Sequence, residues 1–437
     1  MIRIIIPLFL MTLLACTEST KNETIEKVEN FAPQRLPEDI SQITKSDLKE
    51  LILMFGDAKV IGISEGTHGM IEPLNFRNEL LKLLVEEKRI GAIAFESGLV
   101  EGKLIYDYVN GKKVSLDTVM LKGVTCGFGE FEVNRELLIW LREYNLTLAE
   151  NEKIHMYGYD IPGCASNPFL ENARVGFDYA LDYLDKMDSI NSEVQRSLLS
   201  PLLAKLRVGD NQEDDRPSYL DIDSTGWNSI LGVLLDLAQI IETNEKEYVA
   251  ISGLEEYIWA QRSVFCAEQN VKFLQGLGNA DSNFSPREKG QLENVRWIVE
   301  REKGRNVALF AHLAHLAKEL HSKTTNSLPE LMAGEYLAAE YGEDYCVIGN
   351  FYRKLDWFDD DPIILKDSLL SNELEKEGMS NFYMKLDKTD PIWQKEWAFA
   401  KLTSYGQLYM YPAKSVDIVF YNDIQTWLYL PQEEEAD

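Results

Sequence analysis

The chain has 437 residues, 45% of them hydrophobic, which is enough to bury the core of one large domain with an insertion or of two domains. Its 44 basic and 72 acidic residues give a formal net charge of -28. This composition argues against a disordered chain, and the negative charge repels phosphate backbones, so no nucleic-acid partner is expected.

The first 15 residues resemble a bacterial lipoprotein signal peptide. Arg3 supplies a short positive region, Ile4 to Leu14 form an apolar stretch too short to span a bilayer, and Ala15 directly precedes Cys16. The resemblance implies cleavage before Cys16, a lipid on its thiol, and a membrane-anchored protein of the cell envelope that faces the periplasm or the exterior. The alternative is an ordinary secretory signal followed by a chance cysteine.

Residues 16–40 are polar and contain two prolines, and we interpret them as a tether between the lipid and a folded domain. Beyond them, residues 41–166 and 305–437 are expected to form an α/β core. Apolar runs predict its strands at Ala58 to Ser64, Ile90 to Phe95, Ile154 to Tyr159, Asn306 to Ala311, Tyr345 to Gly349 and Val416 to Tyr421. A crossover helix over Pro73 to Lys88 makes the first two strands a parallel, right-handed βαβ unit. We therefore expect a mostly parallel central sheet flanked by helices.

Residues 167–304 differ from the core because they have the period of helices. The helical segments are predicted at Phe177 to Met187, Ile230 to Glu242, Leu254 to Leu277 and Arg287 to Lys303. The acidic, turn-prone stretch Gly209 to Ser224 interrupts them and is interpreted as a solvated loop. We expect a large all-helical insertion, which could form one wall of a cleft.

Four cysteines follow Cys16, namely Cys126, Cys164, Cys266 and Cys346. Their wide spacings match no zinc knuckle or Cys-x-x-Cys motif. Cys346 lies in an apolar run and is expected to be a buried thiol. A bridge between Cys126 and Cys164 is one possibility in an exported protein, but their spacing does not establish it.

Polar side chains follow the predicted strands at the point where each strand ends. Glu65 and His68 come after the first strand, Glu96 ends the second, and Asp160 ends the third. Parallel strands bind ligands at their carboxyl ends, and Glu96 is expected beside the first strand or one strand away. A carboxylate next to an imidazole can orient the ring and stabilise its protonated form, as a water-activating base requires. We predict catalytic Glu65, His68 and Glu96, with Asp160 as a substrate contact.

His312 and His315 follow the fourth predicted strand. They are three residues apart, so both rings lie on one side if this segment is a helical turn. Such a pair can bind a metal, shuttle protons or donate to an oxyanion, and a structural role for one of them stays open.

Arg77 lies on the predicted crossover helix, four residues before Leu81 and seven before Leu84. This spacing places it on the stripe that packs toward the sheet. Its guanidinium could hold Glu65 or Glu96 ionised or contact a substrate oxygen, or it could snorkel to water.

The segment Gly62-Ile-Ser-Glu-Gly66 fits the G-x-S-x-G pattern of a serine nucleophile after a strand. That nucleophile elbow leads straight into a helix, whereas here residues 67–73 intervene. We therefore favour a histidine-based site over a Ser64 nucleophile.

The chain from about Val60 to the C-terminus resembles the erythromycin esterase family. The resemblance rests on motifs in the family's order, namely Glu65-Gly-Thr-His68, Arg77, Glu96, Gly158-Tyr-Asp160 and Ala311-His312-Leu-Ala-His315. It implies an α/β protein with helical additions that hydrolyses an ester such as a macrolide lactone, with one histidine activating water and no covalent serine intermediate. Ser64 stands where members commonly have Gly, and Leu313 stands where Asn often separates the two histidines.

The leading hypothesis is a lipid-anchored hydrolase of a small-molecule ester that uses His68, Glu65, Glu96, Arg77, His312 and His315 without a cofactor. One alternative is a metal-dependent hydrolase in which Glu65, His68, His312 and His315 bind a divalent ion. Another is a non-catalytic envelope lipoprotein that binds a ligand. The sequence does not determine the substrate or the oligomeric state.

Overall fold

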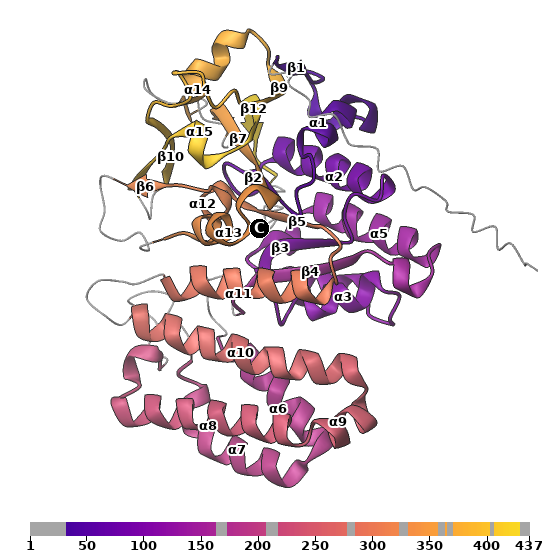
Figure 1. Ribbon diagram of the computed structural model, residues 1–437. Helices are drawn as coiled ribbons and strands as arrows, with labels where there is room; N and C mark the ends of the chain where they lie inside the picture. The colour runs from indigo at the N-terminus through magenta and orange to yellow at the C-terminus, as the bar shows by residue number, and fades with distance from the viewer. Residues whose placement is uncertain are drawn as a thin grey trace, which may run out of the picture.

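A mostly parallel sheet forms the centre of the molecule (Figure 1). Its strands lie in the order β1 (Gln34–Arg35), β9 (Asn381–Lys385), β12 (Ile418–Thr426), β7 (Tyr345–Asp356), β2 (Val60–Glu65), β5 (Val307–His312), β3 (Ala92–Gly98) and β4 (His155–Asp160). The pairs from β12 to β4 are parallel, whereas β1, β9 and the short β8 (Ile363–Ile364) pair antiparallel. The expected α/β architecture is confirmed, and β5 separates β2 from β3, so Glu65 and Glu96 lie one strand apart.

This computed structural model describes residues 32–162, 173–206, 217–277, 285–322, 331–356, 363–364, 370–402 and 406–428. The predicted signal peptide, Cys16, most of the tether and Cys164 lie outside these ranges. Within these ranges, no helix combines the length and the apolar composition needed to cross a bilayer.

The central strands are buried on both faces, and for this reason they read as continuous apolar runs. All six residues of β2 and all six of β5 are buried. Side chains alternate between the faces, so Ala308 and Phe310 pack on one side of β5, while Val307 and Leu309 pack on the other. Each strand can therefore end in polar residues only at the rim of the sheet, where its apolar run stops.

Helices cover both faces of the sheet. On one face, apolar side chains of α1 (Lys49–Met54), α2 (Ile71–Glu86) and α5 (Glu132–Leu146) pack on the strands, and on the other those of α11 (Ser285–Arg301), α12 (Leu313–Leu316) and α13 (Ala333–Tyr341) do so. The helix α3 (Lys103–Val109) packs against the edge strand β4. The remaining short elements are α4 (Leu116–Thr118), α14 (Leu370–Leu374), α15 (Pro412–Ser415), the π-helical turn η3 (Val119–Gly123), and 3-10 turns that include η4 (Phe128–Glu130).

A helical bundle lies beyond the β4 edge of the sheet, with α11 between the bundle and the sheet (Figure 1). Its helices are α6 (Val175–Met187), α7 (Ser189–Leu203), α8 (Ser224–Thr243), α9 (Glu245–Ser252) and α10 (Leu254–Leu277). They bury a core of their own that includes Phe177, Leu181 and Leu237. The all-helical insertion is thus present as expected. The predicted loop Gly209 to Ser224 falls largely outside the described residues, and its last part contains a 3-10 turn at Tyr219–Asp221.

A small antiparallel sheet of β10 (Trp397–Leu402), β11 (Gly406–Met410) and β6 (His321–Ser322) was not expected from the sequence. Its strands are short and lack a clear alternation of apolar and polar residues, so periodicity does not reveal them.

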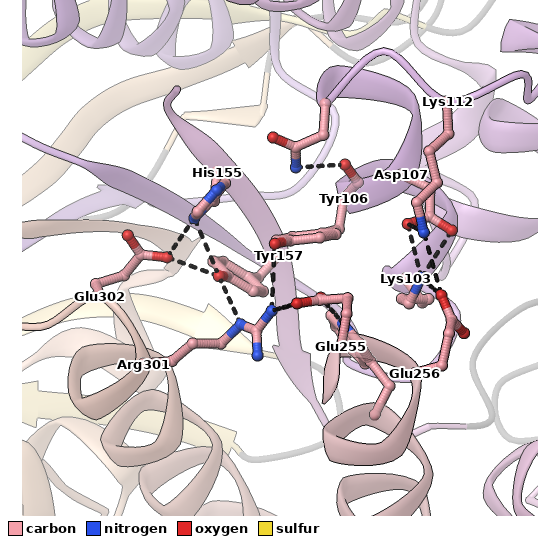
Figure 2. Close-up of polar contacts among 12 residues, drawn as sticks. Lys103, Tyr106, Asp107, Lys112, His155, Tyr157, Glu255, Glu256, Arg301 and Glu302 are labelled. Carbon is pink, nitrogen blue, oxygen red and sulfur yellow. Dashed lines mark hydrogen bonds and ion pairs between the residues drawn. The ribbon is translucent and has the colours of Figure 1, made fainter. Parts of the chain in front are cut away.

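Polar contacts link α11 to both the bundle and the core (Figure 2). Arg301 forms an ion pair with Glu255 of α10 and donates to the hydroxyls of Tyr106 and Tyr157, each at 3.2 Å. The Tyr157 hydroxyl in turn donates to Glu302 at 2.6 Å. Because these residues come from α3, β4, α10 and α11, they tie the insertion to the sheet at the amino end of β4.

Candidate active site

The ends of four parallel strands bring the predicted residues to one edge of the sheet. Glu65 at the end of β2 lies opposite His312 at the end of β5. Glu96 lies on β3 at an irregularity of the β3–β4 ladder, which resumes where Gly98 pairs with Asp160. Bulges of this kind re-aim side chains next to functional sites. Four side chains from strands distant in the sequence therefore share one rim.

Glu65 and His68 form a pair in which the carboxylate is buried and the imidazole is accessible. His68 Nδ1 lies 2.6 Å from Glu65 Oε1, and the side chains are 41% and 2% exposed, respectively. The turn between them is held by the Gly66 N–H, which donates to Asn350 Oδ1 at 3.0 Å. Since Nδ1 faces a carboxylate, it carries the proton, and Nε2 has no hydrogen-bond partner among the described residues. In this partly exposed ring, Nε2 is therefore the nitrogen left to bind a water molecule.

The charge of Glu65 sets the protonation of His68. The partial burial of the ring lowers the pKa of His68, but the nearby Glu65 carboxylate outweighs this effect and raises the pKa to about 8. The ring is therefore mostly protonated on both nitrogens at pH 7, and Nε2 becomes available as a base as the pH rises above about 8.

His312 is a neutral imidazole that braces the turn. Its Nε2 donates to the Gly66 carbonyl at 3.0 Å, and its Nδ1 accepts the Ala314 N–H at 3.1 Å. Burial and the nearby positive charge of His68 lower the pKa of His312 to about 3. The ring lies 5.1 Å from that of His68, centroid to centroid. Both nitrogens are therefore used in holding backbone groups.

Arg287 lies at the centre of the site, although it was not among the site residues predicted from the sequence. It belongs to the first turn of α11, its side chain is 5% exposed, and it donates to Asp160 Oδ2 at 2.6 Å and to Glu96 Oε1 at 2.9 Å. Its Nε lies 3.1 Å from each Asp160 oxygen. Asp160, which was predicted to contact substrate, is instead buried in this ion pair and also accepts the Ile161 N–H at 2.7 Å.

His315 completes a buried network of charges. Its Nδ1 lies 2.9 Å from Glu288 Oε2, and its Nε2 lies 3.2 Å from Glu96 Oε1. Burial opposes protonation of His315, but Glu288 and Glu96 raise its pKa. Burial would likewise raise the pKa of Glu96, yet His315, His68 and Arg287 lower it to about 2. The network thus contains ionised groups that neutralise one another.

Arg77 is internal and does not snorkel to water. Its guanidinium is fully buried, with its carbon 4.7 Å from the centroid of the Phe95 ring and 4.4 Å from that of Phe310. It donates to the amide oxygens of Asn78 and Asn134, each at 2.7 Å. Burial lowers the pKa of Arg77 to about 9, and the charge of Glu65 opposes that shift. Among the described residues Arg77 makes no hydrogen bond to Glu65 or Glu96, and it acts on Glu65 through its charge.

The four proposed metal ligands do not point to a common centre. Glu65 faces His68, both nitrogens of His312 face backbone groups, and those of His315 face Glu288 and Glu96. In the described parts of the chain, no three His, Cys, Asp or Glu side chains are arranged to hold a metal ion. The geometry of the site therefore gives the metal-dependent alternative no support.

The Ser64 hydroxyl is buried and accepts the Asn350 N–H at 2.9 Å, so its surroundings are those of a structural residue. Cys126 is in a disulfide, and its partner lies outside the described residues. Cys266 and Cys346 are buried thiols, as expected for Cys346.

Comparisons with known proteins place this chain in a family. The sequence profile of the family described as erythromycin esterase matches residues 85–354, which include Glu96, Arg287, His312 and His315. The chain is 24% identical over 323 residues to erythromycin esterase type II of Escherichia coli, covering 69% of this chain and 71% of that protein. It is also 27% identical over 132 residues to the type I enzyme of Escherichia coli, covering 29% of this chain and 31% of that protein.

Three solved structures share the fold. A Bacillus cereus protein superposes with a TM-score of 0.72 at 17% identity, covering 91% of this chain and 97% of its own. A structure described as a succinoglycan biosynthesis protein gives 0.69 at 18%, covering 94% and 98%. A mutant of the erythromycin esterase EreC in its open conformation gives 0.66 at 14%, covering 90% and 97%. These structures show the fold, and the match of the family profile to more than half of the sequence shows that the chain belongs to the erythromycin esterase family.

Proposed function

We propose that this protein hydrolyses an ester, with macrolide lactones as the first candidate substrates, by direct attack of a water molecule that His68 activates. Family membership supports a hydrolase of this kind, since the relatives of the chain are named erythromycin esterases. The observation that carries the mechanism is the His68 ring, which pairs with Glu65 through Nδ1 and has no hydrogen-bond partner at Nε2 among the described residues.

The proton balance of the reaction needs only this pair. Neutral His68 accepts a proton from water at Nε2 while the hydroxide attacks the ester carbonyl, and Glu65 stabilises the imidazolium that forms. When the tetrahedral intermediate collapses, the imidazolium returns the proton to the leaving alkoxide. One ester and one water thus give one acid and one alcohol, and the enzyme ends in its starting state.

The buried charges would act as support for the pair. Glu96 Oε2 accepts the His312 N–H at 2.8 Å, so the network of Glu96, Arg287 and His315 holds the end of β5. His312 in turn holds the Gly66 carbonyl in the turn that leads to His68. The donation by His312 or His315 to an oxyanion, expected from the sequence, would require one of these bonds to break first.

The test is hydrolysis of a panel of macrolides and simple esters, followed by mass spectrometry for the addition of one water. We expect turnover by the native protein and loss of about 100-fold or more in a His68→Asn variant, because general-base catalysis contributes roughly this much. The matched control is His321→Asn, which removes another histidine paired with a carboxylate, Glu396, at 2.6 Å in the small sheet. Full turnover in the His68→Asn protein would remove His68 from the mechanism.

We also propose that the protein is a lipoprotein of the cell envelope, with the lipid on Cys16. The order of charge, apolar run and cysteine supports this, and the disulfide at Cys126 is typical of an oxidising compartment. Metabolic labelling with an alkyne fatty acid should label the native protein and not a Cys16→Ser variant. Equal labelling of the two proteins would refute the anchor.

A further inference from the structure

A small cavity is lined in part by the buried Glu65. Its volume is about 10 Å³, and Glu65, Arg77, Phe128 and Asn134 are among the residues that line it. Glu65 Oε1 is bonded to His68, whereas Oε2 is buried and has no hydrogen-bond partner among the described residues. A cavity at the lower size limit for one water molecule therefore adjoins a buried carboxylate oxygen that needs a donor.

Arg77 also lines this cavity and brings a positive charge to it. Its Nε and Nη2 donate to Asn78 and Asn134, while Nη1 has no hydrogen-bond partner among the described residues. The rings of Phe95 and Phe310 enclose the guanidinium, so it is shielded from solvent. A water that accepts from Nη1 and donates to Glu65 Oε2 would satisfy both groups at once.

Asn134, on the first turn of α5, connects both supports of the Glu65–His68 pair. It is 3% exposed, and its Oδ1 accepts from Arg77 Nη2 at 2.7 Å. Its Nδ2 donates to the Phe128 carbonyl at 2.8 Å, and the Phe128 ring lies 5.1 Å from that of His68. A single amide thus holds the cation behind the carboxylate and the aromatic residue beside the imidazole.

We infer that Asn134 is a positioning residue for His68, and that one bound water joins Arg77 to Glu65 across the cavity. The inference deepens the proposed function, on which it rests for its catalytic meaning. Asn134 keeps the guanidinium at a fixed place behind Glu65, so the carboxylate directs Oε1 to His68. Without this acceptor, Arg77 would turn to Glu65 as the nearest available anion and draw the carboxylate away from the imidazole.

The experiment is an NMR titration of the histidine ring nitrogens, in which the His68 signal is assigned by its loss in a His68→Asn protein. In the native protein we expect a pKa of about 8. In Asn134→Leu, an apolar replacement of similar size, we expect the pKa to fall by about one unit, because Glu65 interacts less with the ring. In Asn134→Asp, which keeps an acceptor for Arg77 and adds negative charge, we expect it at or above the native value.

The control is Asn145→Leu, on the same helix. Asn145 is 1% exposed and makes its bonds to backbone groups of Val109 and Ile154, which are remote from the site. This variant should lose stability without changing the His68 titration. A merely structural role for Asn134 would give the same result as the control, and would overturn the inference.

Two further readouts keep the proposal open to refutation if the Asn134→Leu protein does not fold. A crystal structure at about 1.5 Å should contain the water in the native protein, and an empty cavity would refute it. A fall of the His68 pKa in the folded Asn134→Asp protein would refute the role of Asn134. If the pKa changes as expected but no ester is hydrolysed, the proposed function fails while the positioning role stands.

Discussion

Replacing Arg287 with leucine should strongly destabilise the protein. Arg287 is the cation shared by two buried carboxylates, Glu96 and Asp160, which are 5% and 2% exposed. Leucine removes the charge and all the N–H donors while keeping apolar bulk at the site. Two carboxylates would then remain in a poorly hydrated interior without their principal partner.

The size of the effect follows from this burial. Removing one member of a buried ion pair costs about 3–5 kcal/mol, because the remaining charge is desolvated and uncompensated. The control is Arg296→Leu on the same helix, whose side chain is 36% exposed and pairs with Glu293 and Glu340. Solvent screens such a pair, so its loss should cost about 0–1 kcal/mol.

The assay is urea unfolding at pH 7, monitored by circular dichroism. The native protein and both variants are compared with a common slope of the unfolding free energy against urea concentration. A deficit of Arg287→Leu below about 1 kcal/mol, or equal to that of Arg296→Leu, would refute the reasoning. The deficit should also shrink as the pH falls, because protonation of Glu96 removes the charge that Arg287 compensates. A deficit independent of pH would point to lost packing instead.

Three other predictions concern the titrating groups and the thiols. In Glu65→Gln the acidic limb of the profile of kcat/KM against pH should move from a pKa of about 8 toward 6.5, the ordinary value for histidine. The kcat should fall about tenfold, because His68 becomes a weaker base. An unmoved limb in assays of ester hydrolysis would contradict this. The pKa of His312 is about 3 in the native state and near 6.5 when unfolded, so the unfolded chain binds the extra proton between these values. Melting temperatures should therefore drop as the pH falls from about 6.5 to 3, and they should drop less in His312→Asn. Equal dependence of the melting temperature on pH in the two proteins would argue against a neutral buried ring. Iodoacetamide should modify neither Cys266 nor Cys346 in the native protein, and mass spectrometry that finds rapid labelling of either would show that its burial is wrong.

The central sheet was predictable because its strands are buried on both faces. A strand such as Val307–His312 must be apolar at every position until the rim, so its sequence marks both the strand and the place where it ends. The polar residues just beyond, including Glu65 and His312, could then be assigned to one edge. Helical periodicity likewise placed Arg77 on the buried side of α2.

The sequence did not reveal which side chains of distant elements contact one another. Arg77 binds Asn134, 57 residues away, and no periodic pattern indicates that contact. Arg287 lies in a polar helix in the insertion, where a charged residue is expected to be solvated. The one available signal was that Arg287, Gln291 and Asn294 repeat at helical spacing, a polar stripe on the side of α11 that the structure buries.

The placement of α11 restricts how this protein can be recombined with its relatives. One end of the helix supplies Arg287 to the rim, and the other supplies Arg301 to the contacts at the amino end of β4. A chimera that exchanges residues 173–277 would keep the ion pairs of Arg287 and the bonds of Arg301 to Tyr106 and Tyr157, and it would need an acidic residue at position 255 to keep the ion pair of Arg301 with α10. The rest of the bundle is then free to diverge, and with it whatever the bundle contributes to substrate choice. An exchange that also replaced α11 would remove Arg287 from the charge network. Among natural relatives, we therefore expect the bundle to vary more in sequence than α11.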